Sequence, residues 1–117
     1  MNNLLIEAVV VNHLLMALDT SVSTEVPKNP PSEFVVVEKT GSNRTNLINT
    51  ATLAIQSYGA TMYDAAVLNE NVKEAMDDLI ADDSIASVRF QSDYNYTDTS
   101  TKRYRYQAVY NVTYYEK

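Results

Sequence analysis

Few side chains in this sequence are of the types that carry acid–base, nucleophilic or metal chemistry. Cysteine is absent, which excludes disulfides, thiolate zinc sites, iron–sulfur clusters and cysteine nucleophiles. His13 is the only histidine, and the chain has no Gly-x-Ser-x-Gly turn to place a serine nucleophile beside it. We therefore interpret His13 as a surface or contact residue of a helix, and we expect no catalytic residues.

Two pairs of adjacent carboxylates, Asp77-Asp78 and Asp82-Asp83, could suggest a metal ion. Neighbouring residues on a helix point in different directions, and the spacing of an EF-hand loop, with its glycine and terminal glutamate, is absent. A solvated acidic face is the better interpretation of these residues. We expect neither a metal ion nor any other cofactor.

Nucleotides and nucleic acids are also disfavoured as ligands. Gly41-Ser42-Asn43-Arg44 lacks the Gly-Lys-Ser/Thr ending of a phosphate loop, and the net charge of −6 gives no basic field for a nucleic acid. The tyrosines near Arg103 and Arg105 could stack on bases. Alternation along a strand instead predicts that these tyrosines share a core or interface face, with the two arginines on the opposite face.

The charges are divided unevenly along the chain. Residues 1–88 carry 4 basic and 12 acidic side chains, whereas residues 89–117 carry 5 basic and 3 acidic ones. The paired aspartates lie at or just after the carboxyl end of a predicted helix, where the helix dipole already concentrates negative charge. This placement predicts a compensating cation from another chain. The predicted contact joins an acidic surface of one subunit to a basic patch of the next: Glu70, Glu74, Asp77 and Asp78 facing Arg89, Arg103, Arg105 and Arg44.

Residues 4–18 have the apolar spacing of a helix on two rows. The row predicted to face the core is Leu4, Ala8, Val11, Leu15 and Leu18. The second row lies roughly opposite and consists of Ile6, Val10, His13 and Ala17. A helix that is apolar on two sides of so small a domain is either sandwiched or in contact with another chain. Ile6, Val10 and His13 are therefore candidate subunit-interface residues.

The rest of the chain predicts five strands and one further helix. The strands are expected at residues 21–26, 34–38, 50–58, 84–94 and 103–115, with polar loops at 41–46 and 96–102. The second helix begins with a capping box at Thr61 and has one narrow apolar stripe: Ala65, Leu68, Val72, Ala75, Met76 and Leu79. The order α-β-β-β-α-β-β predicts a single α+β domain over residues 1–117, with two helices packed on a mostly antiparallel sheet.

The apolar amino-terminal segment raises the question of a signal peptide or membrane span. No lysine or arginine precedes Lys28, and Glu7, Asn12 and His13 interrupt the apolar run. We therefore expect a cytoplasmic chain with no membrane partner.

One stretch of the sequence resembles a known family. Residues 25–41, Glu-Val-Pro-Lys-Asn-Pro-Pro-Ser-Glu-Phe-Val-Val-Val-Glu-Lys-Thr-Gly, resemble the tail terminator proteins of long-tailed siphophages, also called tail completion or minor tail proteins. The likeness continues through Asn46-Leu47-Ile48, residues 51–57, the Ala-rich second helix and residues 105–110. It thus covers nearly the whole chain, on loose structural motifs.

The resemblance implies a structural virion protein. Members of this family form a ring of identical subunits, usually a hexamer, on the last ring of the tail tube, at the head-proximal end of the tail. The ring stops tube polymerisation and joins the tail to the head connector. The implied partners are other copies of the chain, the tail tube protein and the head–tail connector proteins. The family has no enzymatic residues to carry over.

Two alternatives stay open at this point. A neck or head-completion protein of a phage would have the same sequence features. A small ligand-binding or enzymatic α+β domain belongs to a different class, and a convergent pocket with perturbed titratable groups would favour it.

Overall fold

The computed structural model describes residues 5–115, and its element order is the predicted one, α-β-β-β-α-β-β. The elements are α1 (Ile6–Ala17), β1 (Ser21–Ser23), β2 (Phe34–Thr45), β3 (Ile48–Gly59), α2 (Met62–Asp77), a short 3₁₀ turn (Leu79–Ala81), β4 (Ile85–Asn95) and β5 (Tyr104–Tyr115). The α+β class and the mostly antiparallel sheet are therefore confirmed.

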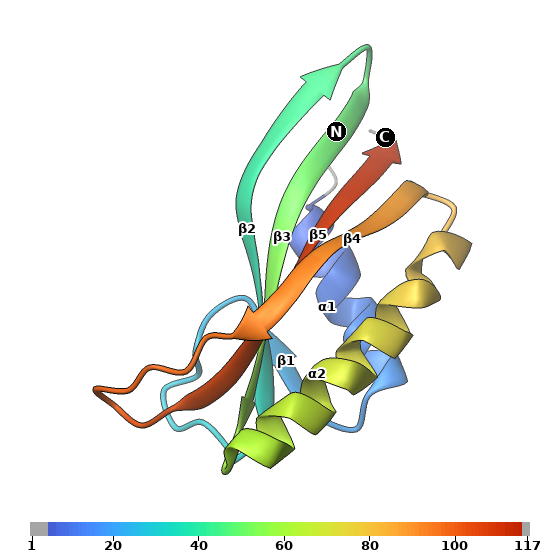
Figure 1. The fold of residues 1–117 in the computed structure, drawn as a ribbon. Coiled ribbons are helices and arrows are strands. Elements are labelled where there is room, and N and C mark those ends of the chain that lie inside the picture. The colour runs from blue at the N-terminus through green and yellow to red at the C-terminus, as the bar shows by residue number, and fades with distance from the viewer. Residues whose placement is uncertain (1–4, 116–117) are drawn as a thin grey trace.

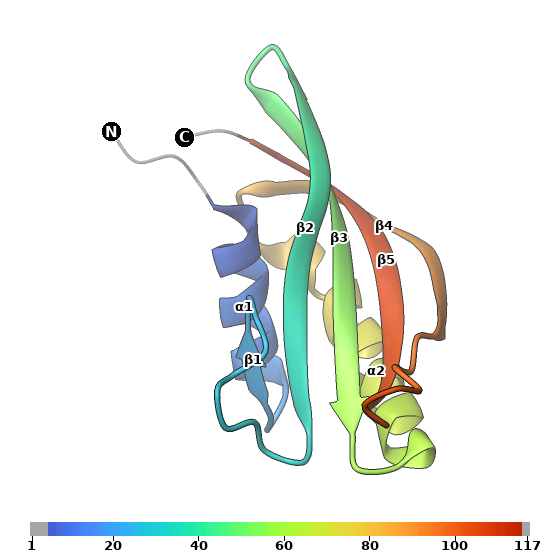
Figure 2. The same cartoon turned by 90° about the vertical axis from the view of Figure 1, so that its left-hand side faces the viewer.

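The five strands form one sheet in the order β1-β2-β3-β5-β4. β1 runs parallel to β2 for three residues, and all other neighbours are antiparallel. Both helices pack on one face of this sheet (Figures 1 and 2). The opposite face carries no helix among the described residues.

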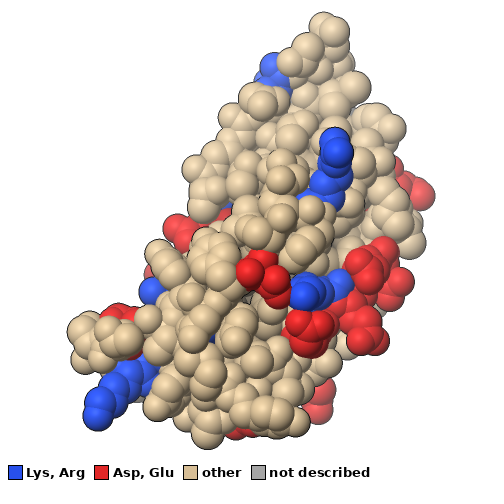
Figure 3. All heavy atoms as spheres, viewed as in Figure 1, with Lys and Arg blue, Asp and Glu red and all other residues tan. Residues whose placement is uncertain are grey.

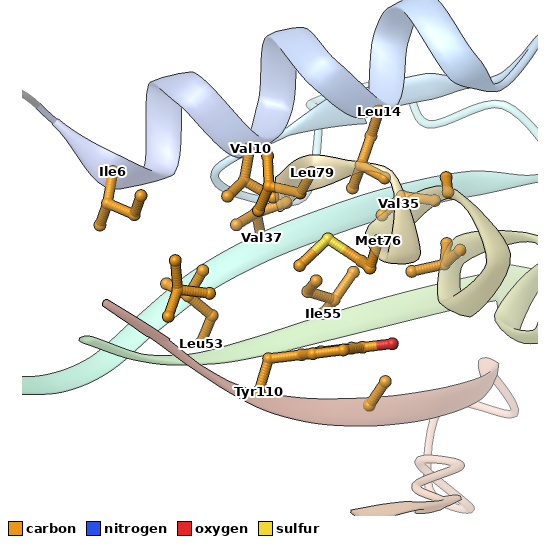
Figure 4. Close-up of a cluster of buried hydrophobic side chains, with 14 of the residues drawn as sticks. Ile6, Val10, Leu14, Val35, Val37, Leu53, Ile55, Met76, Leu79 and Tyr110 are labelled. Atoms are coloured by element: carbon orange, nitrogen blue, oxygen red, sulfur yellow. The ribbon is translucent and has the colours of Figure 1, made fainter. Parts of the chain in front are cut away.

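The main core lies between the helices and the covered face of the sheet (Figure 4). α1 contributes Ile6, Val10 and Leu14, all fully buried, which point toward β2 and β3. The predicted assignment of the α1 faces is therefore wrong: Ile6 and Val10 belong to the core, and Leu15 is exposed. A helix that is apolar on several sides does not mark its inward side by pattern alone. Leu4 lies outside the described residues.

α2 agrees with the sequence prediction in both its start and its buried face. The Thr61 hydroxyl accepts a hydrogen bond from the Asp64 amide at 3.1 Å, as an N-cap should. The predicted stripe is buried along its whole length: Ala65, Leu68, Val72, Ala75, Met76 and, in the 3₁₀ turn, Leu79. This single narrow stripe admitted only one orientation of the helix on the sheet.

The predicted loop at residues 41–46 is wrong, because β2 continues as a strand to Thr45. β2 and β3 pair along their whole length and are joined by a two-residue turn at Asn46 and Leu47. The end of this hairpin, residues 39–50, is called the arm below. It projects past both helices (Figures 1 and 2). The predicted loop at residues 96–102 is confirmed apart from one isolated bridge between Asp98 and Arg103.

Candidate interaction surfaces

The arm is exposed on both faces of its β2 strand. All eight β2 residues from Glu38 to Thr45 are exposed, whereas the four before them are buried. β1 pairs only with residues 34–36, so no described strand pairs with the outer edge of β2 from Val37 onward. Exposed and edge-unpaired strands of this kind are surfaces that natural proteins protect or use for contacts.

A bulge determines where the charges of the arm point. Lys39 lies opposite Leu53, and Arg44 lies opposite Asn49, with a register shift between Lys39 and Gly41. Leu53 and Asn49 are four residues apart on β3, so their partners share one face, although Lys39 and Arg44 are five apart. Because Leu53 is a core residue, this is the helix-covered side of the sheet. Both cations of the arm are thus on that side.

The turn at the tip of the arm has an unusual sequence for its conformation. Asn46 and Leu47 have φ angles of 52° and 67°, the combination of a type I′ turn, for which Asn-Gly is the preferred pair. The left-handed conformation costs a residue with a Cβ roughly 1–2 kcal/mol. The Leu47 side chain is 62% exposed, so core packing does not offset this cost.

A groove with acidic walls lies between the end of α1 and the exposed side of α2. It has a volume of about 480 Å³ and carries three carboxylates, Asp19, Glu74 and Asp78, and no lysine or arginine. Apolar atoms of Leu18, Leu68 and neighbouring alanines line its inner part. Met16, 90% exposed, lies just before the groove residues of α1. The groove can therefore receive a group that is cationic and apolar.

His13 joins the two helices next to this groove. Its Nε2 lies 2.6 Å from the carbonyl oxygen of Ala75, and because a carbonyl only accepts, Nε2 carries the proton. The residue is half-buried. His13 thus ties α1 to α2 within the chain, and its place in a subunit interface stays a prediction.

The acidic residues of α2 gather on one part of the surface (Figure 3). Lys73 lies among them and bonds Glu70 and Asp93, each at 2.9 Å. The hydrogen bond from Lys73 lowers the pKa of Asp93, and the buried Asn69 amide also donates to that carboxylate, at 2.8 Å. In turn, the hydrogen bonds that Lys73 donates, to Asp93 first and then to Glu70, raise the pKa of Lys73. Glu74, Asp77 and Asp78 are exposed.

The predicted basic residues do not form one patch. Arg89 lies opposite Asn111 and Arg105 opposite Tyr58, both on the uncovered face but about 20 Å apart along the strands. Arg44 is on the arm, on the other face. The predicted contact between one acidic surface and one basic patch is thus wrong in its basic half.

Arg105 is held within the chain. Its guanidinium donates from Nε to the Tyr96 carbonyl at 2.6 Å and from Nη1 to the Tyr58 hydroxyl at 2.8 Å, and it lies over the Tyr96 ring. Arg103 lies at the end of the loop that Asp98 organises. The Ser100 hydroxyl bonds Asp98 at 2.7 Å and lowers the pKa of Asp98 to about 2. Arg105 thus completes the fold of its own subunit, whereas Arg103 is exposed and joins Asp98 through backbone hydrogen bonds.

Polar side chains bonded across the strands cover most of the uncovered sheet face. Gln56 bonds Gln107 at 2.9 Å, and Thr52 bonds Asn111 at 2.9 Å. Next to this ladder, the Phe34 and Tyr58 rings stack with centroids 4.3 Å apart. The hydrogen-bonding groups of this face are largely paired, and a small pocket of about 210 Å³ lies at its end, with Phe34, Tyr58 and Arg103 among the lining residues.

The sequence matches no protein-family model and no curated protein. Over residues 5–115, no cluster of three or more histidine, aspartate or glutamate side chains could hold a metal ion. No helix of that part of the chain is long and apolar enough to cross a membrane. Shifted pKa values occur at Lys73 and Asp93, at Asp98 and at Tyr110. Burial raises the pKa of Tyr110 to about 12, and Asp77 adds to the effect.

Proposed function

We propose that this chain is a structural subunit that assembles with copies of itself into a ring, in the manner of a siphophage tail terminator. The observation that carries the proposal is the arm, a paired hairpin that projects beyond the core and is exposed on both faces of β2. Ordering a projecting hairpin costs conformational entropy, and the hairpin makes few packing contacts within its own subunit that could offset this cost. Contact with another molecule accounts for its retention.

The side chains on the surface support a role in assembly rather than in catalysis. The groove beside α1 has acidic walls, and the groups with a shifted pKa form an ion pair, a turn cap and a buried tyrosine. An active site would be expected to gather such groups in one pocket. We therefore favour a role in assembly over an enzymatic one.

In the proposed role the ring sits at the head-proximal end of the tail in the virion, after assembly in the host cytoplasm. It would stop polymerisation of the tail tube protein and present its other side to the head–tail connector proteins. A ring needs two different complementary surfaces on each subunit, since a single self-complementary patch closes a dimer. The arm and the acidic side of α2 are two such surfaces, with opposite charge.

The test is sedimentation velocity with electron microscopy of the purified protein over a range of concentration and salt. We expect closed rings at low salt and dissociation at high salt. Reversing Asp77 and Asp78 to lysine should leave the subunit folded and weaken assembly, because both are exposed. The matched control reverses Glu25 and Glu33, two exposed acidic residues outside α2. A protein that stays monomeric under all these conditions, or forms only dimers, contradicts the proposal.

A further inference from the structure

The arm and the acidic groove are complementary in charge. From residue 39 to residue 63 the sequence contains Lys39 and Arg44 and no carboxylate, so the arm is purely cationic. The groove carries Asp19, Glu74 and Asp78 with no cation in its walls. The first 27 residues contain no lysine or arginine, so α1 supplies no counter-charge. Lys73 of α2 is bonded to Glu70 and Asp93.

The two surfaces are also complementary in apolar character. Leu47 at the tip is 62% exposed, and Ile48 beside it is 42% exposed. The groove offers the half-buried Leu18, and Leu68 also lines it with 3% of its surface exposed. An apolar side chain flanked by a cation thus matches an apolar floor flanked by anions.

The backbone of the tip points to a function outside its own subunit. Glycine would adopt the φ of Leu47 without strain, whereas leucine does so at a cost and with most of its side chain in solvent. Such strain in a native protein is a reason to look for a role of the strained residue. A role for Leu47 in an intermolecular contact explains the choice of leucine at this position.

The arm cannot fill the groove of its own subunit. It continues β2 and β3 away from the helices, while the groove lies at the other end of α1, beside the turn into β1 (Figures 1 and 2). The molecule is 43 Å long and 23 Å across, so the two surfaces are separated along its length. The complementary groove is therefore that of a second copy.

We propose that the tip of the arm, centred on Leu47 and Arg44, docks in the groove between α1 and α2 of the neighbouring subunit. This inference rests on the proposed function and names the contact that closes the ring. The contact is heterologous, because each subunit gives its arm to one neighbour and its groove to the other. Leu47 enters the groove, and Arg44 lies against Glu74 or Asp78.

The absence of cysteine allows a direct test by disulfide trapping. Two single variants of the full chain, Leu47→Cys and Asn71→Cys, place one thiol on the tip and one on the exposed side of α2 at the groove. Mixed and mildly oxidised, they should yield a covalent dimer joining the two variants, because a disulfide forms only where the Cα atoms approach to about 7 Å or less. The control pairs Leu47→Cys with Tyr63→Cys, at a position that is also exposed but does not line the groove.

Three further variants test the geometry of the contact and its charge. The double variant Leu47→Cys, Asn71→Cys should give a ladder of covalent species that ends at the size of the ring. Arg44→Glu should reduce trapping about tenfold, and adding Glu74→Lys should restore much of it, since the exchanged pair is again attractive. Circular dichroism shows whether each variant is folded.

The outcomes separate this inference from the proposed function. Rings seen by electron microscopy without any tip-to-groove disulfide leave the assembly standing and overturn the arm contact. A product of two Leu47→Cys chains that exceeds the mixed product indicates a self-complementary contact and overturns it as well. If Leu47→Cys forms as much disulfide with Tyr63→Cys as with Asn71→Cys, the disulfides arise from random collision, and the arm contact is again overturned. A protein that never associates overturns both proposals.

Discussion

The two halves of the β2–β3 hairpin are made of the same two strands in very different surroundings. At the covered end, Val35 and Val37 face the helices and are fully buried, as are Ser57 and Ile55 opposite them. In the arm, β2 is exposed on both faces. The covered end owes its stability to apolar burial. The arm depends on strand pairing and its turn, because it has little apolar surface to bury.

This difference also concerns register. A strand that is polar on both faces specifies its pairing weakly, because a slip of one residue changes no burial. In the arm, the pairing register is set by the register of the covered end and by the two-residue turn. The core therefore determines where the arm points, and the arm is free to vary its side chains for contact.

The largest expected effect is in the core of the covered half. Leu68→Ala should lower the free energy of unfolding by roughly 2–5 kcal/mol, because the removed side chain is nearly fully buried and leaves a cavity. Leu47→Ala, the same change at the exposed tip, should cost less than about 0.5 kcal/mol. Urea unfolding of both variants measures the contrast. Equal losses would mean that the two regions do not differ in the way the structure shows.

The two glycines of the chain give a second contrast. A Cβ at Gly59 would lie 2.4 Å from the Ala65 backbone nitrogen, so Gly59→Ala forces β3 and α2 apart and should cost roughly 1–3 kcal/mol. A Cβ at Gly41, in the arm, would meet nothing within 4 Å. Gly41→Ala should therefore change stability by no more than about 1 kcal/mol, and in the stabilising direction. Thermal unfolding of both variants checks the order.

The ion pair between Lys73 and Asp93 should contribute less to the free energy of unfolding than the core does. Asp93→Asn should cost about 1–2 kcal/mol at neutral pH, because Lys73 and Asn69 lose a charged acceptor. Glu70→Gln, on the exposed side of the same lysine, should cost under about 0.5 kcal/mol. Denaturant titrations of the two variants and the wild type measure these differences.

The contribution of Asp93 should also depend on pH. The native pKa of Asp93 is lower than the ordinary value of 3.8, so the stabilisation is complete above that value and is lost as the pH falls below it toward the native pKa. The wild type and Asp93→Asn should therefore converge in stability at acidic pH. A difference that stays constant from neutral pH down to about pH 2 would show that the carboxylate charge is not its source.

The smallest expected effect has the opposite sign. Leu47→Gly should raise the stability of the isolated subunit by up to about 1 kcal/mol, because glycine relieves the left-handed strain of the turn. The same variant should weaken assembly, since it removes the apolar tip. Asn46→Gly is the matched control, because it also relaxes the turn but keeps the leucine. Loss of stability in Leu47→Gly would show that the leucine supports its own subunit.

The sequence by itself determined the element order, the α+β class and the details of α2. Its single apolar stripe and its capping threonine each allow one structural outcome, because burial of that stripe and pairing of the first helix amides are both local requirements. The exclusion of thiol chemistry likewise followed from composition.

Only the tertiary structure decided which face of α1 is buried, that residues 41–45 continue a strand, and that Arg105 is held between Tyr58 and Tyr96. α1 is apolar on several sides, so the shape of the sheet beneath it selects Ile6, Val10 and Leu14. The β2 strand of the arm is polar and contains a glycine, which are features typical of a loop. It is nevertheless a strand, because it continues the buried part of β2 and pairs with β3 up to the turn. For α1 and for Arg105 with Tyr58, the deciding interaction joins segments far apart in the chain, where the local pattern has no information.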